Sequence, residues 1–143
     1  MVNSSVLALD PGAKRIGVAA SDPLGISVKP LAFIPAQPED EALRKIAAVV
    51  AEREAGTVVI GLPINMDGTE GPAAKSAREF AERLRAALPS PAPAIVLWDE
   101  SLTTDEAEKR LMERGLSHRE RKQVIDSLAA AILLKSWLDA QRT

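Results

Sequence analysis

The stretch LALDPGAKRIGVAASD, which starts at Leu7, constrains the fold more than any other part of the chain. It consists of two apolar runs separated by a Pro-Gly turn, and the first run ends in the carboxylate of Asp10. Apolar runs joined in this way are typical of two paired β-strands. The sequence therefore predicts strands over 6–10 and 16–21. It places Asp10 at a strand end, beside a glycine where a phosphate can approach the backbone closely.

The rest of the chain alternates between strand and helix patterns. Pro30 has no N–H to donate, so the strand predicted over 27–34 belongs at a sheet edge. Apolar residues at helical spacing from Leu43 to Val50 predict a helix, for which Gly56 is the expected stop. The other expected elements are a central strand over 57–61, a helix over 72–88, a buried strand over 94–98, a helix from 103 to about 115 and a last helix over 123–139.

This order of elements predicts the fold class. An antiparallel meander followed by right-handed βα crossovers gives an α/β fold, a five-stranded mixed sheet flanked by helices on both faces. The ribonuclease H-like fold has this order. With 143 residues and no long linker, the chain is expected to form a single domain over 1–143.

Composition narrows the function classes. The absence of cysteine excludes disulfides, Cys-zinc sites and thiol catalysis. The chain has neither a secretory signal pattern nor a long apolar span, so we expect a cytoplasmic protein without membrane contact. A net charge of −2 does not favour nucleic-acid binding, although local charge decides that question. Two Phe, two Trp and no Tyr argue against a surface that stacks bases on a row of aromatic rings.

Three acidic residues occur where their neighbours are apolar. Asp10 ends the first strand, Glu100 follows the last strand, and Asp126 lies early in the last helix. Converging carboxylates repel one another unless a cation binds between them, and hard oxygen ligands favour Mg²⁺ or Mn²⁺. Such a site suits phosphodiester hydrolysis. Each acid also has a structural explanation of its own. Asp10 could be a turn residue before Pro-Gly, Glu100 a solvated strand end, and Asp126 an acid favoured by the dipole at a helix N-terminus.

Candidates for substrate contact lie close to these acids in sequence. Lys14 and Arg15 follow Asp10 and could meet the phosphates that flank the cut, or they could simply be the solvated tip of a hairpin. A glycine-containing loop could touch a ligand or form only a structural turn. Its candidate residues are Asn65, Asp67, Gly68, Thr69 and Glu70. The charge-rich segment 109–122, with His118, is better explained as a mixed solvated surface.

Four segments, LALDPGAKRIGVAASD, VVIGLPINMDGTEGP, DESLTT and VIDSLAAAILL, occur in this order between residues 7 and 134. With them the chain resembles the YqgF/RuvX family, described as pre-16S rRNA nucleases or as similar to Holliday-junction resolvases. The resemblance implies a metal-dependent nuclease that acts on the 5′ end of precursor 16S rRNA or on branched DNA. It carries over the acidic positions Asp10, Glu100 and Asp126, and Thr103 of the DESLTT segment is a further candidate for substrate contact.

The chain departs from the family pattern at two places. Ser101 stands where the family usually has an arginine, which could hold a phosphate with two hydrogen bonds. Related resolvases have a glutamate at the end of the fourth strand, where this chain has Gly61. Either Glu100 supplies that ligand from the neighbouring strand, or Asp67 or Glu70 does so from the loop. We favour Glu100, with Glu70 second.

Two other functions fit parts of the sequence. A nucleic-acid-binding module without catalysis is supported by Ser101, but retention of three carboxylates argues against it. A nucleotide-binding domain of the actin type would use the Asp10 turn on phosphates, but such proteins need two domains. Within the nuclease interpretation, the sequence separates neither RNA from DNA junctions nor a monomer from a homodimer.

Overall fold

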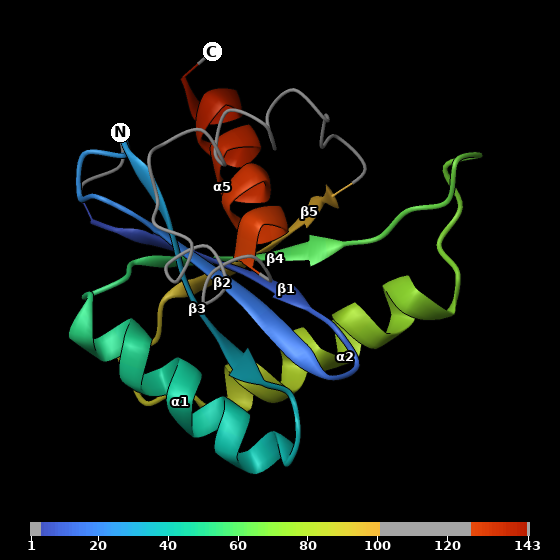
Figure 1. The fold of residues 1–143 in the computed structure, drawn as a ribbon, viewed down its shortest axis with the longest axis horizontal. Helices are drawn as coiled ribbons and strands as arrows, with labels where there is room; N and C mark the ends of the chain where they lie inside the picture. Colours follow the sequence, from blue (N-terminus) through green and yellow to red (C-terminus); the bar gives the residue numbers. More distant parts are fainter. Residues whose placement is uncertain (1–3, 101–126, 143) are drawn as a thin grey trace, which may run out of the picture.

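The computed structural model describes residues 4–100 and 127–142, which form a five-stranded sheet with helices on both faces (Figure 1). The elements are β1 (Val6–Pro11), β2 (Arg15–Ser21), β3 (Val28–Pro35), α1 (Glu39–Glu52), β4 (Thr57–Leu62), α2 (Pro72–Ala87), β5 (Ala94–Asp99) and α5 (Leu128–Gln141). The strand order is β3-β2-β1-β4-β5. β1, β2 and β3 pair antiparallel, whereas β1, β4 and β5 run parallel. The predicted mixed sheet and helices on both faces are confirmed.

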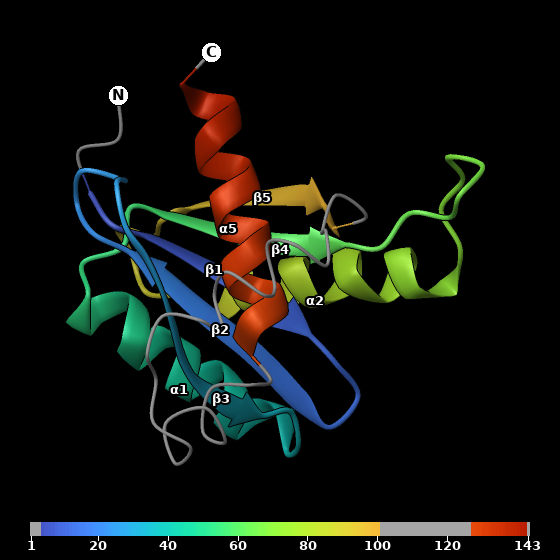
Figure 2. The same cartoon turned by 45° about the horizontal axis from the view of Figure 1, so that its top comes forward.

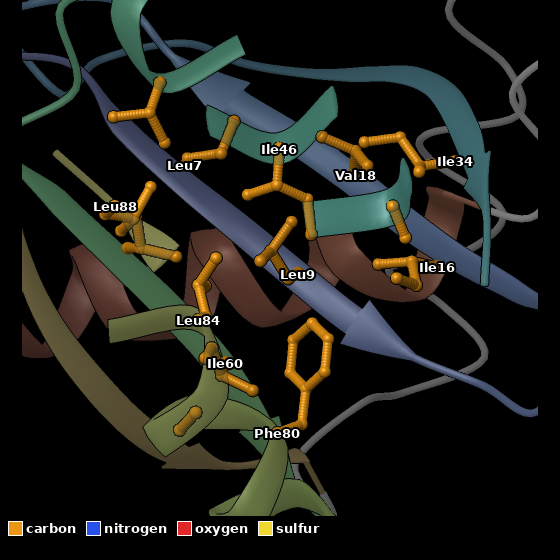
Figure 3. Packing of buried hydrophobic residues seen from close by; sticks show 14 of the residues in the cluster. Leu7, Leu9, Ile16, Val18, Ile34, Ile46, Ile60, Phe80, Leu84 and Leu88 are labelled. Carbon is orange, nitrogen blue, oxygen red and sulfur yellow. The ribbon is translucent and has the colours of Figure 1, made fainter. Parts of the chain in front are cut away.

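The two faces of the sheet carry separate parts of the core, because neighbouring strand residues point to opposite sides. Leu7 and Leu9 of β1 face α1 and α2, whereas Val6 and Ala8 face α5. Figure 3 shows the first of these clusters between the sheet and the helices α1 and α2. Its labelled members are Leu7, Leu9, Ile16, Val18, Ile34, Ile46, Ile60, Phe80, Leu84 and Leu88.

A buried hydrogen bond fixes the start of α5 on the sheet. The pairing of β2 with β3 shifts register between Ile16 and Val18. The hydroxyl of Ser127, which is fully buried, accepts the backbone N–H of Val18 at 2.9 Å. Val18 lies opposite Leu9 of β1, one residue before Asp10. Ser127 is therefore attached to β2 directly beside β1, the strand that carries Asp10.

Two expectations about the elements are wrong. α1 ends at Glu52, and Glu54, not Gly56, takes the positive φ of 51° that follows it. Gly56 instead allows close packing, since a Cβ there would collide with the hydroxyl of Ser4. The strand expected to be buried over 94–98 is the edge strand β5, whose residues are only partly buried after the exposed Ala94.

Other expectations about the elements are confirmed or fall outside the described residues. β3, with Pro30, is an edge strand, and β4 lies between β1 and β5. Pro72 begins α2 as expected. The helix expected from 103 and the residues 123–126 of the last helix lie outside the described residues. Within 4–100 and 127–142, no helix has the length and apolar character to cross a membrane.

The chain leaves the sheet in opposite directions after its two central parallel strands. β1 continues into β2 on one side, whereas β4 continues through α2 into β5 on the other side. A crevice forms at the carboxyl ends of parallel strands where the connections diverge in this way, and ligands bind there in many α/β proteins. Asp10 lies at this point of the fold.

Candidate active site

The parallel strands bring two of the three predicted acids together. Asp10 lies near the end of β1 and Glu100 directly follows β5, with β4 between the two strands. Since β1, β4 and β5 run in the same direction, their carboxyl ends meet at one edge of the sheet. The side chains of Asp10 and Glu100 are hydrogen-bonded to each other across β4.

Gly61 of β4 provides the space in which this contact forms. A Cβ at this position would lie 2.4 Å from Oε2 of Glu100 and 3.4 Å from Cδ2 of Leu133. A side chain of any size at position 61 would therefore compete with the carboxylate for the same volume. A glutamate at position 61 and the observed position of the Glu100 carboxylate would therefore exclude each other, and this chain has glycine at the first and the carboxylate at the second.

The environment of Glu100 disfavours its ionised form. Burial raises the pKa of Glu100 to about 7, and the hydrogen bond and charge of Asp10 and the charge of Asp99 act in the same direction. Two carboxyl groups that share a proton are an expected state of such a pair without a cation. The excess of negative charge at this edge is the property that a divalent cation would relieve.

The hairpin after Asp10 carries the two predicted cationic contacts. The N–H of Gly12 donates to the carbonyl oxygen of Arg15 at 2.9 Å, and a Cβ at Gly12 would lie 2.7 Å from that oxygen, so the turn needs glycine. Lys14 and Arg15 are exposed. The guanidinium of Arg15 lies 5.3 Å from the ring centre of Phe33, within the range of a cation–π contact. Both cations therefore lie at the solvent-facing end of the β1–β2 hairpin.

The predicted contact loop projects beyond the sheet between β4 and α2 (Figures 1 and 2). Its polar side chains bond within the loop. Asn65 Nδ2 donates to Thr69 Oγ1 at 3.0 Å, and Thr69 Oγ1 donates to Asp67 Oδ1 at 2.6 Å. The hydroxyl and the backbone N–H of Thr69, which both donate to Asp67, hold the pKa of Asp67 below its usual value. Gly68 has a positive φ of 87° at the turn.

Glu70, the second choice for the missing ligand, is engaged elsewhere. Arg78 of α2 donates from Nε at 2.6 Å and from Nη2 at 2.7 Å to the two carboxylate oxygens of Glu70. Hydrogen bonding to Arg78 lowers the pKa of Glu70. The structure therefore favours Glu100 over Glu70 and Asp67 as the acid that lies with Asp10.

The remaining predicted site residues, Asp126 and Thr103, lie outside the described residues, as do Ser101 and the charged segment with His118. Within residues 4–100 and 127–142, no three acidic or histidine side chains gather as metal ligands. The trio of Asp10, Glu100 and Asp126 thus stays a prediction, of which the structure brings two members together.

Sequence reasoning missed two residues that build this site. Ser127 attaches the start of α5 to β2, beside β1, and Arg78 binds both carboxylate oxygens of Glu70. A small hydroxyl residue directly after an acid, at the start of an apolar helix, is a signal that could have pointed to Ser127. The eight-residue separation of Glu70 and Arg78 across a loop offers no comparable signal.

Solved structures resemble this fold at low sequence identity. The Holliday junction resolvase of fowlpox virus aligns with a TM-score of 0.56 and 13% identity, over 95% of this chain and 99% of that chain. The RuvC structure of Thermus thermophilus aligns with a TM-score of 0.50 and 15% identity, over 96% of each chain. At these identities the likeness establishes the ribonuclease H-like fold.

Sequence relatives are much more similar to this chain. A protein of Pelotomaculum thermopropionicum is 45% identical over 137 residues, 95% of this chain and 87% of the relative. A protein of Geobacillus kaustophilus is 42% identical over 138 residues, 95% of this chain and 98% of the relative. Both carry the name "Putative pre-16S rRNA nuclease".

The family comparison agrees with these relatives. The family model described as "RuvX: Holliday junction resolvase" matches residues 4–140, nearly the whole chain. Together with relatives above 40% identity, this match means that the chain belongs to the RuvX family.

Proposed function

We propose that this protein is a divalent-metal-dependent nuclease that hydrolyses phosphodiester bonds, with the 5′ region of precursor 16S rRNA as its first candidate substrate. The observation that carries the proposal is the meeting of Asp10 and Glu100 at the carboxyl ends of β1 and β5. Nucleases of this kind need carboxylates fixed at one point, where phosphate and metal can be held together.

The metal ligands in this proposal are Asp10, Glu100 and Asp126. The two described acids fit a hard cation, because they offer only carboxylate oxygens and because burial, together with the nearby Asp10, raises the pKa of Glu100. Asp126 is included because Ser127, its neighbour in sequence, is bonded to β2 beside the strand of Asp10. Bound Mg²⁺ or Mn²⁺ would activate water and stabilise the leaving oxygen.

The other residues of the proposed site bind and orient the substrate. Lys14 and Arg15 meet phosphates next to the cut, and their position on the hairpin of Asp10 supports this role. Asn65, Asp67, Gly68, Thr69 and Glu70 form the loop that contacts the substrate farther from the acids. Thr103 completes the set of proposed contacts. Lys14 and Arg15 supply a local positive charge that the net charge of −2 does not reveal.

The choice of substrate rests on the relatives. Those at 42% and 45% identity are named for pre-16S rRNA, and precursor rRNA is found in the cytoplasm, which we propose as the compartment. Branched DNA is the second candidate, because the matching family is described as Holliday junction resolvase. A junction resolvase makes paired cuts and so requires a two-fold dimer, whereas end processing of RNA is open to a monomer.

Cleavage assays test this function. Purified protein is given a precursor 16S rRNA fragment or a four-way DNA junction, each with Mg²⁺ or Mn²⁺. We expect the RNA to be cut with metal and left intact with EDTA. Asp10→Asn should abolish the cut, whereas the matched change Asp139→Asn at the far end of α5 should leave it unaltered. The proposal fails if neither substrate is cut with either metal, or if Asp10→Asn cuts as fast as the wild type. Binding without cleavage would identify a binding module instead.

A further inference from the structure

A cavity of about 490 Å³ opens beside the acid pair. Most of its walls come from three places, namely the tip of the β1–β2 hairpin, the junction of β3 with α1 and one side of α2 between Ala73 and Arg83. Glu100 and Gly61 also line it, so the cavity is continuous with the proposed hydrolytic centre. Its volume lies within the range of about 300–1,000 Å³ that is typical of small-ligand sites.

Small apolar residues make the space. Ala36, Ala73 and Ala77 line the cavity together with Gly12 and Phe80. The ring of Phe80 lies between α2 and the sheet (Figure 3). Each of these positions would reduce the volume if it carried a longer side chain. An apolar wall of this kind suits a flat, weakly polar group better than a hydrated one.

The charges of the cavity disfavour a phosphate as its occupant. Among the described residues, the charged side chains that line it are Glu39, Arg83 and Glu100. Arg83 is paired with Glu39, because its Nε and Nη2 both donate to the carboxylate, the second at 3.2 Å. The single cation is thus neutralised, and the remaining group is an acid. A phosphate would meet no unpaired positive charge on the described part of this lining and would face the carboxylate of Glu100, whereas a neutral ligand is not repelled by that carboxylate.

Two polar side chains could recognise the edge of such a ligand. The carboxamide of Gln37 offers two donors and an acceptor, and the hydroxyl of Ser76 both donates and accepts. Proteins that recognise single-stranded RNA bind splayed bases with this combination of an apolar slot and polar groups at the base edge.

We propose that this cavity receives one unpaired nucleobase, from the nucleotide next to the phosphodiester bond held at Asp10 and Glu100. This inference rests on the proposed nuclease function. The shared wall at Glu100 and Gly61 places a base in the cavity when its phosphate lies at the acid pair. The cavity requires the nucleotide at the cut to be unpaired, which makes it a determinant of specificity for single-stranded segments.

Binding of nucleoside 5′-monophosphates tests the cavity directly, without cleavage. The probes are AMP, GMP, CMP and UMP at about 10 mM, ten times the Kd of a millimolar ligand, with EDTA present so that metal-bound phosphate does not contribute. We expect at least one nucleotide to shift the backbone amide NMR signals of Ala36, Ala73 and Ala77. Ribose 5-phosphate and inorganic phosphate should leave those signals in place. Equal shifts with ribose 5-phosphate, or no shift with any nucleotide, would overturn the proposal.

Filling the cavity tests its role in cleavage. Ala73→Leu puts a larger side chain into the space from an exposed position, and Ala86→Leu makes the same change on α2 outside the lining. Loss of a bound base is expected to lower kcat/KM for RNA by about 10-fold or more in Ala73→Leu, and to leave Ala86→Leu unaltered. Gln37→Ala, which removes a polar contact without filling the space, should lower it as well and change the preferred base.

The two proposals fail in different ways. If wild-type protein cuts RNA and Ala73→Leu cuts it equally well, the cavity proposal is wrong and the nuclease stands. If no substrate is cut but nucleotides bind and Ala73→Leu abolishes that binding, the nuclease proposal is wrong and the cavity is a nucleobase site of a binding protein.

Discussion

Replacing Glu100 by glutamine should make the metal-free protein more stable and the metal-bound protein less so. Glutamine keeps the size of the side chain and its ability to hydrogen-bond Asp10, but it removes the charge. The environment that raises the pKa of Glu100 penalises that charge in the folded state only. Removing it therefore lowers the free energy of the folded protein at neutral and alkaline pH.

The size of the effect follows from the pKa. A rise from 4.5 to about 7 corresponds to at most about 3.4 kcal/mol, at 1.36 kcal/mol for each pH unit. Glu100 is only partly buried, and solvent screening reduces this to about 1–2 kcal/mol. That stabilisation corresponds to a rise in Tm of about 3–8 °C for a domain of this length.

The pH dependence has a definite sign. Below pH 4.5 the carboxyl of Glu100 is protonated in both the folded and the unfolded protein, so it costs nothing. Between pH 4.5 and about 7 the unfolded chain ionises while the folded protein keeps its proton, and this contribution to stability falls as pH rises. Above pH 7 the full penalty remains. The difference between Glu100→Gln and the wild type should therefore appear across this interval and then stay constant.

Thermal unfolding in EDTA from pH 4 to pH 8, followed by circular dichroism, measures this difference. Glu79→Gln, the same change at an exposed position on α2, is the control and should alter stability by less than about 0.5 kcal/mol. In a second series, Mn²⁺ should stabilise the wild type by about 2.7 kcal/mol at a concentration one hundred times its Kd. It should stabilise the glutamine variant much less. A variant that is less stable than wild type at pH 8 without metal, or that gains as much from Mn²⁺, would refute this account of Glu100.

Four further substitutions test other parts of the site. Gly61→Ala should displace the flexible carboxylate of Glu100. We expect this change to lower the free energy of unfolding in urea by less than about 1 kcal/mol and to lower kcat at least about 10-fold. An unaltered kcat would show that the position of this carboxylate is unimportant for cleavage. Ser127→Ala leaves the buried N–H of β2 unpaired, which should cost about 1–3 kcal/mol in the same assay, and a smaller loss would mean that water replaces the hydroxyl. Lys14→Ala should reduce the slope of log K against log [salt] for single-stranded RNA by about 0.7, as expected for one lost phosphate contact; an unchanged slope would remove that contact from the proposal. Asp126→Asn should abolish cleavage with little change in the urea midpoint, whereas a large drop in that midpoint would indicate a structural role instead.

Much of the fold could be predicted from sequence because its signals are local. The hairpin of β1 and β2 follows from two apolar runs and a turn, and Pro30 identifies β3 as an edge strand by the hydrogen bond it cannot donate. β5 was expected to be buried, because a short apolar run looks the same in the middle of a sheet and at its edge. The position of β5 at the edge depends on the order of all five strands, which its own residues do not reveal.

For the candidate site, the sequence could predict which acids lie at neighbouring strand ends, but not how their side chains are packed. Asp10 and Glu100 could be paired because parallel strands end at one edge. The space that Gly61 leaves for the carboxylate and the capture of Glu70 by Arg78 depend on side-chain geometry across neighbouring elements. Nothing in the local pattern of the loop between β4 and α2 indicates which of its acids is already paired.

During synthesis, the sheet is complete well before the helix that covers its second face. β5 ends at Asp99, and α5 begins only at Leu128. At about 5–20 residues per second, translation of the intervening chain takes about 1–6 s. Over that time Val6 and Ala8 lack the helix that later buries them.

An apolar sheet face without its cover is prone to aggregate, so the nascent chain depends on chaperones or on rapid completion. The residues of α5 are buried on most sides, and Trp137 and Leu138 near its end belong to the same core. A premature stop codon just before this helix would therefore not yield a shortened enzyme. It would yield a misfolded product that proteases remove, and the last part of the gene is as indispensable as the part that encodes Asp10.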